Sequence, residues 1–258
     1  MICSELIDIP TNKALYSIFT NEEGNALDDV IFWKFEDKII LIPNASNLDK
    51  IKSHLTTHNV EYIDKSEDTV LIAVQGPDTI GLIQDRFEIP DKFSTNHTEN
   101  YLYARTGYTG EDGVEIMANN EDADSLLTFL TEKGIKPCGL GSRDTLRLEA
   151  SLPLYGFELT ENITPVEASL SWTLTNKNDY LGSERINNQL SGENHKVLKK
   201  FIIDSRKIAR TETVGIAGET KGLVTSGNFS PILNKSIGFI LFENMPSQDL
   251  IEFDIRGN

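Results

Sequence analysis

The chain has 258 residues, of which 39% are hydrophobic and 25% charged, a balance typical of a folded protein rather than a disordered one. Its formal net charge of −16 argues against nucleic acid or an anionic membrane as the main partner, because both require a basic surface. Two cysteines are too few for a disulfide framework or a zinc site. The N-terminus lacks a signal-peptide pattern and no segment reaches the length of a membrane helix, which predicts a cytoplasmic protein.

The first sixty residues alternate between strand and helix patterns. Alternating apolar residues predict strands at 14–20, 30–35 and 38–42. A helix is expected over 47–58, with Leu48, Ile51 and Leu55 on one stripe. His54 and His58 lie four residues apart in that helix without the glutamate of a zinc-protease motif, so a solvated helix face is expected there rather than a metal site.

The middle of the chain predicts an α+β layer. An apolar strand over 69–74 ends at the turn signal Gln75-Gly76-Pro77, and Asp78 is placed to cap a short helix after it. Further strands are expected at 101–106 and 113–117, and further helices at 122–133 and 141–150. Ser142 is the expected cap of the last helix.

From residue 199 the pattern changes to short strands and turns, including 222–226 and 236–242, which favours a small β-barrel or sandwich. The polar stretch 176–196 is the expected linker before it. Helices between paired strands in the earlier two thirds indicate the α+β class.

The most informative stretch is 105–116, in which Gly107, Gly110 and Gly113 lead into an alternating Val-Glu-Ile run. Period-two alternation places Glu115 on the strand face opposite Val114 and Ile116. A carboxylate fixed on a strand can accept two parallel N–H bonds from the edge of a nitrogen-rich heterocycle. From the residues alone, a charge on the solvent face of an ordinary strand is the alternative interpretation.

Seven phrases of the chain, in this order, resemble one family. They are NEEGNALDDVI (21–31), AVQGP (73–77), GYTGEDGVEI (107–116), GLGSRDTLRLEA (139–150), LYG (154–156), TPVEASLSWTL (164–174) and VTSGNFSPIL (224–233). Together they resemble the T-protein of the glycine cleavage system, a tetrahydrofolate-dependent aminomethyltransferase. A match in register from Ala14 to Gly257 identifies the chain as a member of that family.

The resemblance implies two ferredoxin-like α+β domains, the first incomplete, and a C-terminal β-barrel around a folate channel. The implied division is 1–60 for the first part of domain one, 61–150 for the α+β folate-binding domain, 151–195 for the return to domain one and the linker, and 196–258 for the barrel.

The resemblance also implies the reaction and its residues. A one-carbon unit moves from an aminomethyl-lipoyl H-protein to tetrahydrofolate with release of ammonia, and no metal takes part. The family's catalytic acid or base falls on Asp29. The implied folate contacts are Glu115, Arg143, Tyr108, Asn44 and Trp172.

Read without the family, several of these residues have plainer interpretations. Asp28 and Asp29 would be two neighbouring acids in a turn. Arg143 would form an ion pair with Asp144 or Glu149. Tyr108 would lie at the edge of the core with its hydroxyl in water.

Relative to the family the chain is short at both ends, so part of domain one is expected to be missing. An uncovered edge strand pairs readily with another chain, which predicts a homodimer. Two further functions stay open: a folate-dependent demethylase of a small amine or sulfonium compound, and a non-catalytic folate-binding protein. The Lys-Gly-Cys-Tyr motif of folate-binding assembly factors is absent.

Overall fold

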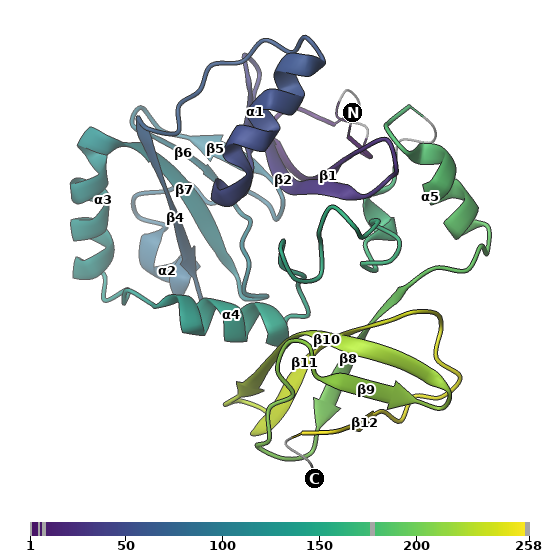
Figure 1. Cartoon of the computed structure of the whole chain (residues 1–258). Coiled ribbons are helices and arrows are strands. Elements are labelled where there is room, and N and C mark those ends of the chain that lie inside the picture. The colour runs from purple at the N-terminus through teal and green to yellow at the C-terminus, as the bar shows by residue number, and fades with distance from the viewer. Residues whose placement is uncertain (1, 5, 7–8, 176–178, 256–258) are drawn as a thin grey trace. The chain divides into compact units, whose positions relative to one another are not determined.

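A computed structural model describes residues 2–4, 6, 9–175 and 179–255 (Figure 1). The structure is of the mixed α+β class with several antiparallel sheets, as the sequence predicts. None of the described helices combines the length and the apolar composition that a bilayer crossing needs.

The chain divides into two compact units that are discontinuous in sequence. Unit 1 comprises Met1–Glu5, Ser17–Val30 and Asp144–Asn258, and unit 2 comprises Leu6–Tyr16 and Ile31–Arg143.

Twelve strands in the described part form three sheets. The first has the order β1-β2-β3, with β1 (Lys13–Thr20), β2 (Ala26–Lys34) and β3 (Ile39–Ile42). The second has the order β4-β7-β6-β5, with β4 (Thr69–Gln75), β5 (Thr95–His97), β6 (Tyr101–Ala104) and β7 (Gly113–Asn119). The third has the order β12-β9-β10-β11-β8, with β8 (Val197–Ile203), β9 (Val214–Ala217), β10 (Thr220–Ser230), β11 (Lys235–Phe242) and β12 (Glu252–Phe253).

Helices connect these strands. They are η1 (Ala45–Asn47), α1 (Leu48–Thr57), α2 (Thr79–Ile83), α3 (Asn120–Glu132), α4 (Leu140–Glu149), η2 (Ser171–Thr173) and α5 (Ser183–Leu190). The predicted helices at 47–58, 122–133 and 141–150 are confirmed to within two residues at their starts. Ser142 is not a cap, because α4 begins two residues earlier and the Ser142 hydroxyl donates to the Gly139 carbonyl at 2.7 Å.

The predicted solvated face of the first helix is partly wrong. His54 and His58 are both half-buried, and their ring centroids lie 4.6 Å apart. Burial comes first among the causes that lower the pKa of His54, and the neighbouring His58 adds to the shift.

In unit 2, α2 and α3 cover one face of the four-stranded sheet (Figure 1). Val114 and Ile116 of β7 pack there with Leu126 and Leu130 of α3 and Ile83 of α2, all buried. A second cluster packs against the other face. It contains Trp33, Phe35 and Ala104, with Leu102, Met117 and several β1–β3 residues around them. Two apolar layers therefore hold this sheet, and β7 contributes to both.

In unit 1, the C-terminal sheet is antiparallel and packs Phe201, Val224, Ile240 and Phe242 into one buried cluster. Its ladder runs from β12 to β8, and no pairing among the described residues closes it. The predicted closed barrel is therefore not found.

The predicted linker over 176–196 contains a helix, α5, although residues 176–178 lie outside the described residues. Its Ile186 is fully buried while most of its other side chains are polar, which is why an apolar stripe was not recognised. Gly182, at its N-cap, has a φ of 71° and meets Gly24, whose φ is 77°. A Cβ on Gly182 would lie 2.0 Å from the Gly24 nitrogen, so this close approach requires glycine.

A buried ionic cluster holds the later part of α4 within unit 1. Arg147 is 2% exposed and donates to Glu158 at 2.9 Å, to the Ser226 hydroxyl at 2.8 Å and to Asp144 at 2.9 Å. Glu158 is fully buried and also accepts from the Leu154 backbone N–H at 3.0 Å. Because each charge has several partners, the cluster meets the condition under which buried ions are tolerated.

Candidate functional site

Glu115 lies in the middle of β7 and is only 7% exposed. Its neighbours Val114 and Ile116 point into the cluster beneath α2 and α3, so alternation turns Glu115 to the opposite face of the sheet, as predicted. The alternative of a solvated surface charge is wrong, because this carboxyl group is buried. A buried carboxyl on a paired strand is costly, and it calls for a compensating partner.

The two residues that pair with Glu115 across the sheet are both alanines. Ala73 of β4 pairs with it on one side and Ala104 of β6 on the other. Ala73 is exposed, whereas Ala104 is fully buried. Cross-strand neighbours share a sheet face, so no side chain longer than a methyl group flanks Glu115 in either ladder position.

The Thr106 hydroxyl donates a hydrogen bond to Oε2 of Glu115 at 2.7 Å. Burial raises the pKa of Glu115, and the Thr106 hydrogen bond and the positive charge of Arg143 oppose that rise. Glu115 therefore takes up a proton more readily than an ordinary glutamate, because its pKa is raised. One of its two oxygens is held by the Thr106 hydroxyl.

Tyr108 and Arg143 lie together in the same unit. The Arg143 guanidinium carbon lies 4.8 Å from the centroid of the Tyr108 ring, within cation–π range. Tyr108 is half-buried in the glycine-rich loop, and Arg143 is exposed in the first turn of α4. The alternative partners of Arg143 are engaged elsewhere, since Asp144 pairs with Arg147 and Glu149 accepts from Ser230. The structure therefore brings Glu115, Tyr108 and Arg143 together in unit 2.

Asn44 also belongs to unit 2. It follows β3 and precedes η1, where its carbonyl accepts from the Asn47 N–H at 2.9 Å, and its side chain is half-buried.

Asp29 and Trp172 belong to unit 1. Asp29 is half-buried inside β2, and its neighbour Asp28 is fully buried, so the two acids alternate along a strand. The interpretation of a turn acid pair is therefore wrong. Trp172 lies in η2 and is 64% exposed.

Sequence reasoning missed Thr106 and Gln75, which both contact the loop before Glu115. The Gln75 amide donates to the Thr106 carbonyl at 3.1 Å and to the Val114 carbonyl at 3.0 Å. Gly107 and Gly113 could have indicated these contacts, because a glycine within a strand hairpin often marks a close approach by another group.

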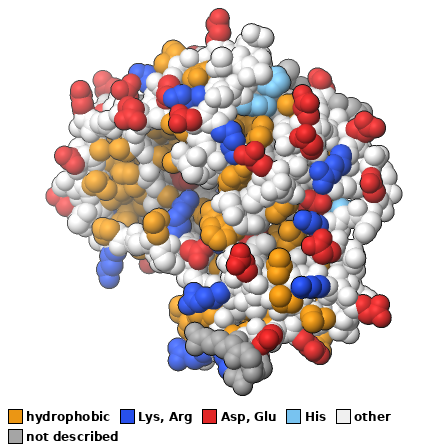
Figure 2. All heavy atoms as spheres, viewed as in Figure 1, with side chains coloured by type: hydrophobic (Ala, Val, Ile, Leu, Met, Phe, Trp, Pro, Cys, Tyr) orange, Lys and Arg blue, Asp and Glu red, His pale blue; other side chains and the backbone are white. Residues whose placement is uncertain are grey.

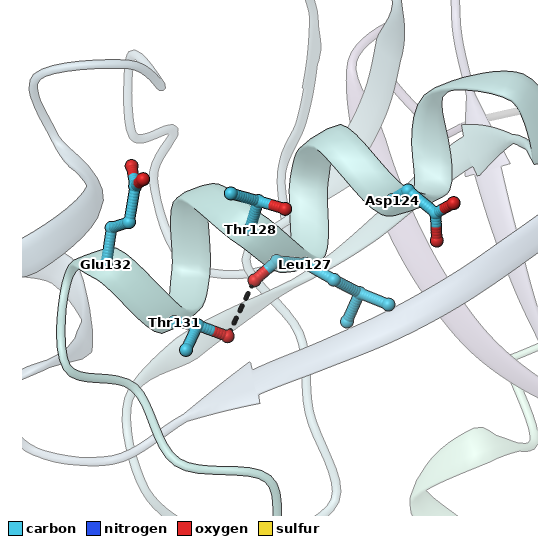
Figure 3. A pocket seen from close by; sticks show the side chains of 5 residues that line it. All are labelled: Asp124, Leu127, Thr128, Thr131 and Glu132. Atoms are coloured by element: carbon cyan, nitrogen blue, oxygen red, sulfur yellow. Dashed lines mark hydrogen bonds between the residues drawn. The ribbon is translucent and has the colours of Figure 1, made fainter.

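A hollow of about 370 Å³ lies along the outer face of α3. Figure 3 shows its lining side chains, Asp124, Leu127, Thr128, Thr131 and Glu132, and the hydrogen bond from the Thr131 hydroxyl to the Leu127 carbonyl. All five come from one helix, whose inner face covers the sheet face opposite Glu115. This hollow has none of the predicted site residues.

Charge is spread rather than gathered on the face of the molecule in Figure 2, where acidic side chains are scattered among basic ones. In the described part of the chain, no group of three or more His, Cys, Asp or Glu side chains is arranged to hold a metal ion.

Comparisons with known proteins identify the family. Residues 1–178 match the family model described as the GCVT N-terminal domain. The chain is 39% identical to an aminomethyltransferase of Synechococcus elongatus over 257 residues, covering 92% of this chain and 69% of the relative. It is 36% identical to an aminomethyltransferase of Corynebacterium aurimucosum over 280 residues, covering 98% and 76%.

The fold agrees with a solved structure. The crystal structure of glycine cleavage system aminomethyltransferase T from Bartonella henselae matches with a TM-score of 0.88 and 24% identity, over 100% of this chain and 76% of that one. At this identity the match shows the shared fold. Together with the family model and the relatives, it confirms the resemblance found in the sequence: the chain belongs to the glycine cleavage T-protein family, the aminomethyltransferases.

Proposed function

We propose that this protein is a tetrahydrofolate-dependent aminomethyltransferase, which moves a one-carbon unit from an aminomethyl-lipoyl H-protein to folate and releases ammonia. The observation that carries the proposal is the buried Glu115 carboxyl, set between two alanines and oriented by Thr106. The relatives support it, since they are named aminomethyltransferases. No observation favours the demethylase or the non-catalytic alternative.

The residues of unit 2 fit a reduced pterin. Such a ring presents adjacent N–H groups along one edge, and a carboxylate accepts two of them in parallel. The ring would lie beside Glu115, whose neighbours on the paired strands are both alanines. Tyr108 offers an aromatic face, and the Arg143 guanidinium offers positive charge for the carboxylates of the folate tail.

Tetrahydrofolate, when bound, supplies the two amine nitrogens that take up the one-carbon unit. The donor's C–N bond breaks to release ammonia and its C–S bond breaks to release the lipoyl thiol, while each folate amine gives up one proton. The two protons end on ammonia and on the thiol, so atoms balance. Asp29 is the base that we propose accepts such a proton and stabilises the positive charge that develops beside it.

The proposal also includes the domains that the family resemblance implies. They are two ferredoxin-like α+β domains, the first of them incomplete, and the four-stranded sheet with α2 and α3 on one face supports the α+β character of the second domain. The H-protein is the proposed donor partner, as expected for the family.

Replacing Glu115 with alanine is expected to weaken tetrahydrofolate binding by about 1–3 kcal/mol, or roughly 5- to 150-fold, because the pterin N–H edge then lacks its acceptor. Isothermal titration calorimetry measures the change. The matched control is Glu111→Ala, which removes an exposed acid from the same loop. If wild type and Glu115→Ala bind tetrahydrofolate with equal affinity, Glu115 does not bind the pterin. Adding an aminomethyl-lipoyl carrier to the folate complex and measuring ammonia then tests the transfer itself.

Folate affinity is expected to fall as the pH falls through the raised pKa of Glu115. Above that pKa the group is a carboxylate and accepts two hydrogen bonds, and below it the added proton removes one acceptor. Because burial raises this pKa, the decline begins at a higher pH than an ordinary glutamate would give. Dissociation constants measured from neutral to acidic pH check this. A Glu115→Gln variant has no such proton to gain, and a similar decline in that variant would assign the effect to another group.

A further inference from the structure

The ends of the glycine-rich loop are joined by one side chain from a different strand. Gln75, the last residue of β4, places its amide nitrogen 3.1 Å from the Thr106 carbonyl and 3.0 Å from the Val114 carbonyl. Thr106 opens the loop and Val114 immediately precedes Glu115. A single amide therefore bridges the two backbone segments from which the Thr106 hydroxyl and the Glu115 carboxyl project.

Two glycines make room for this amide. A Cβ at Gly107 would lie 1.9 Å from the Gln75 Oε1 and 2.5 Å from its Cδ. A Cβ at Gly113 would lie 3.0 Å from the same Cδ and 2.2 Å from the Val74 carbonyl. Neither glycine has a positive φ, so close approach rather than backbone conformation explains both.

From this geometry we infer that Gln75 is a positioning residue, which holds the Thr106 hydroxyl against Glu115 and so fixes the orientation of the carboxylate that receives the pterin. The inference rests on the proposed function of Glu115. Gln75 acts through the loop backbone and through Thr106, and the carboxylate keeps Oε1 and the second acceptor position of Oε2 for the two N–H groups of a ligand.

The electrostatic consequence can be measured without any ligand. Thr106 and Arg143 are the groups that counteract the effect of burial on Glu115. If the amide bridge is lost, the Thr106 hydroxyl is no longer held at 2.7 Å, and the carboxylate loses the hydrogen bond that favours its charged form. The pKa of Glu115 should then rise further above its ordinary value.

The test is an NMR titration of the full-length protein labelled with ¹³C at glutamate Cδ, with the Glu115 signal identified by its absence in Glu115→Gln. In Gln75→Met, which keeps the length of the side chain and removes the amide, the midpoint of the Glu115 titration should move to higher pH. Tetrahydrofolate affinity at neutral pH should fall about ten-fold, the usual effect of losing one hydrogen bond to a charged group. The control Gln84→Met removes an exposed amide at the C-terminal end of α2. This amide donates to the Gly81 carbonyl at 3.4 Å, and its loss should move neither value.

Variants at Thr106 and at Gly107 keep the test independent of the folding of Gln75→Met. Thr106→Val should raise the midpoint and Thr106→Ser, which restores a hydroxyl, should return it towards wild type. Gly107→Ala displaces the Gln75 amide and should act like Gln75→Met, whereas Gly139→Ala, whose Cβ meets nothing within 4 Å, should not.

The outcomes separate the two proposals. If wild type binds tetrahydrofolate, Glu115→Gln binds it more weakly, and both Gln75→Met and Thr106→Val keep the wild-type midpoint and affinity, the positioning role is wrong and the proposed function stands. If wild type fails to bind tetrahydrofolate, the proposed function is wrong, and the midpoints in the free protein still decide whether Gln75 orients the acid.

Discussion

Asp29→Asn is expected to slow ammonia release about 10²- to 10⁴-fold, the usual loss on removing a general base, and to leave tetrahydrofolate affinity unchanged. The amide keeps the shape of the side chain and loses its ability to take a proton. Asp29 is half-buried in β2, so part of its side chain is accessible, whereas Asp28 on the opposite side of the strand is fully buried. Single-turnover measurement of ammonia with saturating tetrahydrofolate separates this effect from binding.

Two control variants sharpen the assignment of the base. Asp204→Asn removes an acid whose side chain is 89% exposed in the same unit and should leave the rate unchanged. Asp28→Asn should lower the stability of unit 1 more than it lowers the rate of the folded enzyme, because its carboxyl is enclosed. An Asp29→Asn enzyme with wild-type turnover would assign the proton transfer to another group.

Glu158→Gln is expected to lower the free energy of unfolding by about 3–5 kcal/mol, the range seen when one partner of a buried ion pair is removed. The Arg147 guanidinium stays buried at 2% exposure and loses the fully buried one of its two carboxylate partners, Glu158 at 2.9 Å, while the more exposed Asp144 remains. Urea denaturation followed by circular dichroism measures the change.

The matched control for this variant is Asp68→Asn, which breaks an exposed ion pair with Lys65 and should cost less than about 1 kcal/mol. A double variant, Arg147→Met with Glu158→Leu, removes both charges and should recover much of the lost stability. Equal destabilisation by Glu158→Gln and Asp68→Asn would mean that the cluster contributes no more than a surface pair.

The sequence predicts much of this fold because apolar periodicity is a local property. The stripe of Leu48, Ile51 and Leu55 sets α1, and the alternation around Glu115 sets its face of β7. Helix α5 was missed because Ile186 is its only fully buried apolar residue. The predicted barrel was wrong in its closure: the C-terminal sheet is open in the described residues. Closure depends on pairing between distant strands, which no local pattern specifies. The division into 1–60, 61–150, 151–195 and 196–258 stays a prediction.

The candidate site was predictable only where the family's residues matched. Glu115, Tyr108 and Arg143 stand in recognisable phrases, although their contact is a property of the folded unit. Gln75 also stands in such a phrase, but its amide reaches a carbonyl 31 residues further along the chain. Side-chain bridges of this kind depend on strand register, which is decided by tertiary packing.

The discontinuous composition of unit 1 has a consequence for how the nascent polypeptide matures. During synthesis the whole of unit 2 has left the ribosome once Arg143 emerges, whereas Ser17–Val30 must wait for partners that begin at Asp144. Gly24 cannot make its close approach to Gly182 until that later segment has been translated. Because closing such long loops is entropically costly and slow, Ser17–Val30 spends the intervening time without its native neighbours from the later part of unit 1, and that side is exposed to chaperones and proteases.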